Sequence, residues 1–161
     1  MNWLDYALNL VILVSLYQIL CHSLRFHLGL GRLFNLAHVA VYGIGAYTTA
    51  LLEVNYQIGF FPALGASMAV CGVFSVLLGA ISLRLSEEYF AIGTIAFSAI
   101  VVSLLVNWKS LTRGVLGIPG IPRPTLGGVE LTENEPFTVL VVCVAGAVLF
   151  LVYWLAQSKL A

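Results

Sequence analysis

The chain has 161 residues, of which 61% are hydrophobic and only 9% are charged, and its mean hydropathy is +1.03. A soluble domain carries about 25% charged residues, so a soluble fold of this length is excluded and lipid is the expected solvent. Seven basic and seven acidic residues give a formal net charge of zero, with no run of Lys or Arg that would follow a phosphate backbone. We therefore expect no nucleic-acid partner.

Five long apolar segments predict five membrane-spanning helices, at residues 6–24, 33–52, 60–83, 89–107 and 137–156. A helix needs about 20 residues to cross a hydrocarbon core of about 30 Å, and it pairs its own backbone polar groups. A transmembrane barrel would show short strands of alternating polarity, which these segments lack. We expect an all-α, polytopic helical bundle, with one segment a candidate for a discontinuous helix.

The second segment, at residues 33–52, is the least ordinary. On a helix its polar or small residues share one stripe at a spacing of three, four, three and four: Asn35, His38, Tyr42, Gly45 and Thr49. Polar groups at membrane depth either line a pathway or bond to a neighbouring helix, and this stripe fits both interpretations. For His38 alone, a satisfied structural hydrogen bond is the simpler interpretation.

The residues before this stripe interrupt the helical pattern. Residues 29–32 read Gly-Leu-Gly-Arg, and Asn35 is suited to cap a helix that begins at Leu36. One interpretation is a discontinuous or re-entrant half-helix, whose positive end would attract an anionic group such as an amino-acid carboxylate. The other is an ordinary span with a cap at the membrane surface.

The third and fourth segments carry packing and capping patterns. The third has small residues at helical spacing, and because helices in lipid associate through close backbone approach, we expect this stripe to face another helix. The stripe consists of Gly65, Ala69, Gly72, Ser75, Gly79 and Ser82. The fourth is preceded by Ser86, a candidate N-cap, and by Glu87 and Glu88 at the positive helix end.

A long connection at residues 108–136 separates the last two segments and is rich in glycine and proline. Prolines fix φ and glycines permit sharp turns, so we expect a shaped, non-helical loop. Residues 117–122 read Gly-Ile-Pro-Gly-Ile-Pro, where the isoleucines offer apolar anchors. A docking surface and a merely packed surface loop both agree with this run.

Several chemistries have no support in the sequence. Cys21, Cys71 and Cys143 lie far apart inside apolar segments, so we interpret them as small buried residues and not as metal ligands or a disulfide framework. Residues 43–47 lack the third glycine and the acidic residue of a dinucleotide site, and no Walker A pattern occurs. No acidic pair has a histidine close in sequence. We expect no cofactor, no metal and no enzymatic activity.

Charge distribution predicts a topology. If all five segments cross, Arg25, Arg32, Arg84 and Lys159 share one side, which the positive-inside rule places in the cytoplasm. Lys109, Arg113 and Arg123 then lie outside, as does the N-terminus. A re-entrant second segment would invert every later side.

Three blocks in order carry a family resemblance. The first, at residues 33–52, contains Gly43, Ala46 and Tyr47; the second, at 89–97, contains Tyr89, Phe90 and Thr94; the third, at 107–124, contains Gly117, Pro119, Gly120 and Pro122. Together they resemble the permeases of branched-chain amino-acid ABC transporters, in particular the LivM-type subunit. The flanking segments agree with that family only in hydropathy.

The resemblance implies a multi-pass, pore-forming subunit in the bacterial inner (plasma) membrane that imports leucine, isoleucine, valine and related amino acids. It implies four kinds of partner: a second homologous permease subunit, two ATP-binding subunits, an external solute-binding protein and membrane lipid. The stripe from Asn35 to Thr49 would then face the substrate. Urea permeases are similar in these blocks, so urea or another small polar solute is the alternative substrate.

The chain also departs from the family pattern. Family members usually have Ser-Leu-Gly-His where residues 35–38 read Asn-Leu-Ala-His, and a basic-Gly-Asp run where residues 86–88 read Ser-Glu-Glu. The chain stops about where family members enter a cytoplasmic segment, rich in Glu and Ala, that engages the ATPase. We therefore expect residues 1–161 to be a single transmembrane permease domain, truncated at its C-terminus.

Two other classes of membrane protein compete with this interpretation. A non-transporting assembly or scaffold protein would use the polar and small-residue stripes only for helix packing. A secondary transporter would normally carry an acid or a lysine within the membrane, whereas Glu53, Arg84 and Glu88 all lie at the ends of predicted segments.

Overall fold

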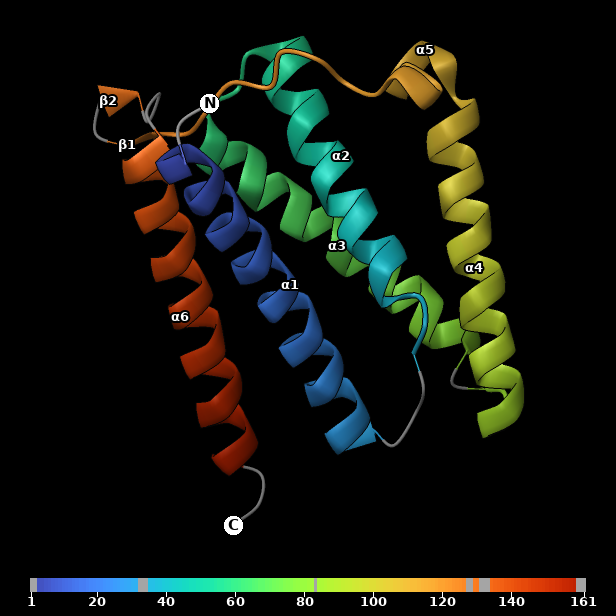
Figure 1. The fold of residues 1–161 in the computed structure, drawn as a ribbon. Coiled ribbons are helices and arrows are strands. Elements are labelled where there is room, and N and C mark those ends of the chain that lie inside the picture. The colour runs from blue at the N-terminus through green and yellow to red at the C-terminus, as the bar shows by residue number, and fades with distance from the viewer. Residues whose placement is uncertain (1–2, 32–34, 83, 127–128, 131–133, 159–161) are drawn as a thin grey trace. The chain divides into compact units, whose positions relative to one another are not determined.

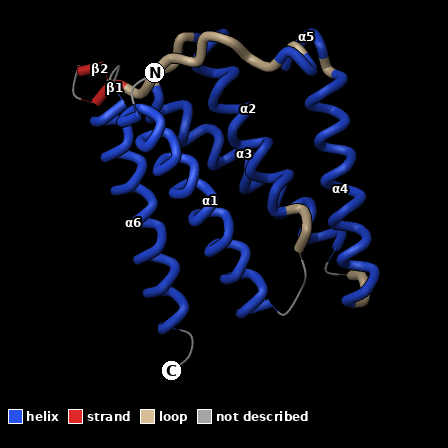
Figure 2. The backbone as a smooth tube through the Cα atoms, viewed as in Figure 1, coloured by secondary structure: helices blue, strands red, loops and turns tan. Residues whose placement is uncertain are grey.

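The computed structural model describes residues 3–31, 35–82, 84–126, 129–130 and 134–158. Figure 1 shows the elements, and Figure 2 shows that strand occurs only in one short hairpin. In chain order they are α1 (Trp3–Gly31), α2 (His38–Tyr56), α3 (Phe60–Ser82), α4 (Glu87–Asn107), α5 (Lys109–Thr112), the 3-10 turn η1 (Gly114–Leu116), β1 (Thr125–Leu126), β2 (Val129–Glu130) and α6 (Asn134–Ser158). The predicted all-α membrane fold is confirmed.

Four helices in the described part of the chain are long and apolar enough to cross a membrane: Trp3–Phe26 of α1, Phe60–Ile81 of α3, Glu88–Asn107 of α4 and Asn134–Leu155 of α6. The second predicted segment forms α2, which is not among them. Its 19 residues include His38, Glu53 and Asn55, so it is a regular helix of more polar composition. The segment that the sequence singles out is therefore also the exception in the structure.

The predicted break at residues 29–32 is placed too early. α1 continues as helix through Gly29 and Leu30 to Gly31. A glycine inside a helix costs only about 1 kcal/mol relative to alanine, which does not stop a long helix that gains one backbone bond per residue. Arg32 lies outside the described residues.

One compact unit, residues 1–32 and 126–161, pairs α1 with α6. The amide nitrogen Nδ2 of Asn134 donates to Oδ1 of Asp5 at 3.1 Å, which joins the first turns of the two helices. Ser15 and Thr138 are buried, and their hydroxyls bond to carbonyls of their own helices, Val11 and Asn134. Small side chains thus permit close approach without leaving a hydroxyl unpaired.

The other unit, residues 33–125, packs α2 along α3 and against α4. Its most buried apolar side chains come from all three helices: Ala37 and Ala40 next to and within α2, Ala63 of α3, and Phe90 and Val101 of α4. Gly45 of α2 meets Cys71 of α3 in the α2–α3 contact, and small residues of this kind are expected where helix backbones approach closely. This unit holds all three sequence blocks of the family resemblance.

Within residues 33–125, the first four residues of the small-residue stripe of α3 do not pack on α2 or α4. Gly65, Ala69, Gly72 and Ser75 are exposed, and a Cβ added to Gly65 or Gly72 would meet nothing within 4 Å. The buried residues of α3 are Ala63, Ser67 and Leu78, on another side of the helix. Within this unit α2 packs on the side of α3 that carries Ser67 and Cys71, so the expectation that the stripe faces another helix stays a prediction.

Several smaller expectations also need correction. Cys71 is half-buried, but Cys21 and Cys143 are exposed, because large parts of α1 and α6 face outward from the chain. The connection at residues 108–136 is not wholly non-helical, since it contains α5 and η1, and α6 already begins at Asn134. Ser86 is the N-cap of α4, as predicted, with extended backbone angles but no side-chain capping bond.

Candidate functional site

The polar backbone before α2 is held in a short turn at residues 35–37. Oδ1 of Asn35 accepts a hydrogen bond from the backbone N–H of Ala37 at 3.0 Å. Ala37 is the N-cap, and its own side chain makes no capping bond. The predicted helix start at Leu36 is therefore wrong by two residues, because the Asn35 side chain stabilises a turn of the kind that Asn favours instead of capping the helix directly.

Two hydroxyl groups of α4 bond the Leu36 backbone. Oγ1 of Thr94 accepts from the Leu36 N–H at 3.2 Å, and Oγ of Ser98 donates to the Leu36 carbonyl at 2.9 Å. Thr94 is fully buried, as is Ala37 beside Leu36. Each backbone group of a non-helical residue thus finds a side-chain partner, as a membrane environment demands.

These two α4 hydroxyls were not recognised as a pair from the sequence. Thr94 was singled out only through the family resemblance, and Ser98 was not named at all. The signal was present, since the two residues are four apart and share one side of an otherwise apolar helix. Hydroxyls placed this way frequently bond across to another helix in lipid.

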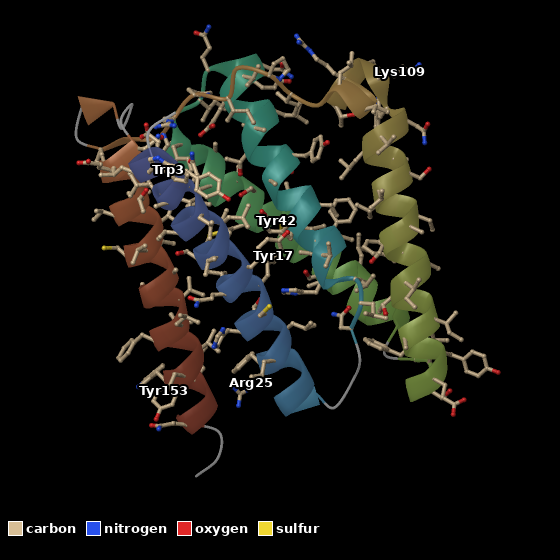
Figure 3. The ribbon with its side chains drawn as sticks, viewed as in Figure 1. Trp3, Tyr17, Arg25, Tyr42, Lys109 and Tyr153 are labelled. Carbon is tan, nitrogen blue, oxygen red and sulfur yellow. The ribbon has the colours of Figure 1, made fainter. Side chains whose placement is uncertain are left out.

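The remaining stripe residues have different surroundings. His38 is the first residue of α2 and is half-buried; Tyr42 projects from α2 and is 47% exposed (Figure 3). Gly45 lies against α3, where an added Cβ would be 3.0 Å from Sγ of Cys71. Thr49 is half-buried and donates to the Gly45 carbonyl of its own helix at 3.1 Å. The stripe therefore runs from the turn at 35–37 past an exposed tyrosine into the α2–α3 contact.

Some of the other motif residues of α2 and α4 pack against neighbouring helices, and others are exposed. Gly43 approaches α4, since its added Cβ would be 3.6 Å from Cδ1 of Leu105. Tyr47 is half-buried and Phe90 is buried, whereas Ala46 and Tyr89 are exposed. Part of the motif therefore builds the helix packing that fixes the turn.

Glu53 is an acidic residue whose surroundings the sequence did not reveal. Its side chain is only 5% exposed, in the last turn of α2. The predicted segment ended just before it, but α2 continues to Tyr56 and closes with Gln57 at φ 52°. A carboxylate near the negative end of a helix gains nothing from the helix dipole, so its burial comes from the packing of α2.

The turn after α4 is fixed by Thr112. This buried residue has its hydroxyl 2.6 Å from the Leu105 carbonyl and 2.9 Å from the Trp108 carbonyl, and the hydroxyl accepts from the Gly114 N–H at 3.2 Å. Gly114 has φ of +62°, and an added Cβ would be 2.6 Å from the Val106 carbonyl oxygen. The start of the connection is thus an ordered structure closed on the end of α4.

Further along the same connection, glycine is required by backbone geometry. Gly117 and Gly120 have φ of +68° and +76°, which side chains rarely adopt. Pro119, Pro122 and Ile121 are exposed, and Ile118 is half-buried. The expected sharp turns are confirmed, and only one of the two isoleucines is anchored.

Comparison with known proteins agrees with this arrangement of blocks. The family model described as "Branched-chain amino acid transport system / permease component" matches residues 6–160. The chain belongs to this permease family. No solved structure matches it.

Two relatives carry the name "High-affinity branched-chain amino acid transport system permease protein LivM". The protein of Salmonella typhimurium strain LT2 is 38% identical and that of Escherichia coli strain K12 is 39% identical, each over 128 residues. The matched region is 80% of this chain but only 30% of each relative. The chain therefore spans about a third of the length of these permeases, and its family membership is shown for that part.

Proposed function

We propose that this chain forms a substrate-lining part of a permease subunit in an ATP-driven importer of branched-chain amino acids. The observation that carries the proposal is the interrupted start of α2, built from two sequence blocks of the family and bonded to α4 through Leu36. A passive packing helix has no need of a non-helical turn beside buried hydroxyls. The subunit moves its substrate without covalent chemistry.

The chemistry of α2 suits an amino acid with an apolar side chain. The positive end of a helix and its amide groups favour a carboxylate, and α2 begins inside the unit at His38. The proposed path follows Asn35, His38, Tyr42, Gly45 and Thr49. Beyond the helix start, the Thr49 hydroxyl already donates to the Gly45 carbonyl of its own helix. A branched aliphatic side chain needs no hydrogen-bond partner, whereas urea would need several.

The proposed assembly contains a second permease subunit, two ATP-binding subunits and an external solute-binding protein, in the bacterial inner membrane. Residues 1–161 act within it as one transmembrane domain. The rigid glycine turns at residues 117–124 form the surface that meets the binding protein or braces the outer gate, since pre-ordered turns lose little entropy on contact.

The test is uptake by the full natural reading frame, coexpressed with its partner subunits in cells that lack other branched-chain importers. Labelled leucine, isoleucine and valine should accumulate, and accumulation should stop when the catalytic residues of the ATP-binding subunit are substituted. Accumulation of urea and not of leucine would identify urea as the substrate. An assembled complex that accumulates neither would assign the chain to an assembly or scaffold role.

A further inference from the structure

Side chains of α4 bond the two backbone groups of Leu36 that a continuous helix would bond within itself. In a continuous helix the carbonyl of residue 36 would accept from the amide of residue 40. Here it accepts from Oγ of Ser98, while its N–H donates to Oγ1 of Thr94. Ala37 and Ala40 are almost completely buried next to this peptide, so water has little access to either group.

The Thr94 hydroxyl is itself fixed, whereas the Ser98 hydroxyl lies within reach of two carbonyls, that of Leu36 at 2.9 Å and that of Thr94 at 3.0 Å. Thr94 is fully buried and donates to the Ala91 carbonyl at 2.9 Å, which orients the lone pairs of Oγ1 toward Leu36. The two residues are four positions apart on a helix that is otherwise packed through Phe90 and Val101. Side chains four residues apart lie on one face of α4, so one hydroxyl reaches the N–H of Leu36 and the other reaches its carbonyl.

We infer that Thr94 and Ser98 are positioning residues that hold residues 35–37 out of the helix and fix the start of α2 to α4. The inference rests on the proposed function in one respect, because it assigns the pair to the same substrate path. It adds that the position of the start of α2 is set by its bonds to α4, and that both hydroxyls are needed to keep residues 35–37 out of the helix.

The test measures the separation of α2 and α4 directly, in the full-length protein in lipid nanodiscs. Spin labels at Val39→Cys and Ile92→Cys report on two exposed positions, in a background where the three native cysteines are replaced. We expect one narrow distance distribution in this parent. Thr94→Val keeps the shape but removes the acceptor, so it should broaden or split the distribution, and Ser98→Ala should do the same to a smaller degree.

Matched controls distinguish loss of the bonds to Leu36 from the general effect of removing a hydroxyl. Thr48→Val and Ser67→Ala remove hydroxyls that, in the part of the chain that the structure describes, bond within their own helices, to Ile44 and Leu64, and they should leave the distribution narrow. Thr94→Ser keeps a hydroxyl and should restore the parent distance. If Thr94→Val does not insert, Ser98→Ala carries the test. Narrow, unchanged distributions in every Thr94 and Ser98 variant that inserts would overturn the inference.

Uptake per assembled complex is the second measurement. It should fall in Thr94→Val and recover in Thr94→Ser, with Thr48→Val near the parent. If even the parent transports nothing, the proposed function fails while the distance measurement still decides the positioning role. If transport occurs and the distances do not respond, the positioning role fails while the proposed function stands.

Discussion

Gly45 of α2 lies so close to Cys71 of α3 that a Cβ at residue 45 would be 3.0 Å from the Cys71 sulfur. The same sulfur bonds the Val41 carbonyl at 3.4 Å, one turn earlier on α2. The two helices therefore meet through a glycine and a small, polarisable side chain, at the centre of the stripe that the sequence singled out. A side chain at residue 45 therefore requires the Cys71 sulfur to shift by a few tenths of an ångström, or α3 to move with it.

This contact predicts a non-additive pair of substitutions. Gly45→Ala gains about 0.5–1 kcal/mol of helix propensity but loses a similar or larger amount through overpacking against Cys71. In a Cys71→Ala background the clash is relieved, so the same substitution should become stabilising. Both effects, in the parent and in the Cys71→Ala background, can be measured as the fraction of protein that stays monodisperse in detergent after heating. Gly72→Ala, which meets nothing, should have one effect in both backgrounds.

A second prediction concerns the turn before α2. Asn35→Ala removes the acceptor of the Ala37 N–H and should cost about 1 kcal/mol, whereas Asn35→Ser and Asn35→Asp keep an acceptor. Uptake per assembled complex should fall in the alanine variant and be retained in the serine variant. Equal uptake by the alanine and serine variants would remove this turn from the mechanism.

Tyr42 and Thr49 test whether the stripe is a path or a packing surface. Thr49 donates its hydroxyl to the Gly45 carbonyl of its own helix, and Tyr42 is about half exposed. Tyr42→Leu and Thr49→Val should therefore assemble normally but transport less per complex. Thr48→Val, with the same intrahelical bond one residue away, is the matched control. A lower yield of complex with normal turnover would favour packing.

The turn after α4 predicts a graded series of glycine substitutions. Gly114→Ala would meet the Val106 carbonyl at 2.6 Å in addition to its positive φ, so it should be the most damaging. Gly120→Ala has open space and should lose about 1–2 kcal/mol through its positive φ. Gly117→Ala also has open space but should lose more, because a φ of 68° with a ψ of −176° is a backbone conformation that essentially only glycine adopts. Gly59→Ala, with open space and no such φ, should be nearly neutral. Expression yield and thermal stability should follow this order, and Gly114→Ala equal to Gly59→Ala would contradict it.

Whether α2 crosses the membrane decides the side on which every later connection lies. α2 is about 28 Å long by its residue count and runs back along α3 after a short turn, so it reaches nearly across a hydrocarbon core although its composition is more polar. We therefore expect the exposed Ser86 inside and the exposed Val115 outside. In a cysteine-free background, an impermeant thiol reagent should label Val115→Cys but not Ser86→Cys in intact cells. The reverse pattern would mean that α2 re-enters.

Hydropathy alone located α3 and α4 well, because length and apolar content are properties of one segment. The third helix was predicted at residues 60–83 and occurs at Phe60–Ser82, and the fourth differs by two residues at its start. The break before α2 was misplaced because Gly29 and Gly31 are weak helix breakers, and the true interruption depends on groups far away in sequence.

Contacts between helices were beyond the sequence for a related reason. Leu36 and Thr94 are 58 residues apart, and only the packing of α2 on α4 brings them together. Which of two smooth sides of α3 faces α2 is likewise decided by a partner and not by α3 itself. Four of the five stripe residues lie on α2, whereas Asn35 lies in the turn before it, and the individual neighbours of all five could not be read from spacing.

The hydroxyl of Ser98 has one proton and two carbonyls within reach, that of Leu36 at 2.9 Å and that of Thr94 at 3.0 Å. When the proton points to Thr94, Ser98 remains satisfied inside its own helix and Leu36 is released. Detachment of the turn from α4 therefore leaves no orphaned donor on α4, and the desolvation penalty falls on the Leu36 peptide alone. A solute that bonds the released Leu36 peptide would offset part of this penalty, so its binding would favour the released turn by its difference in affinity for the two states.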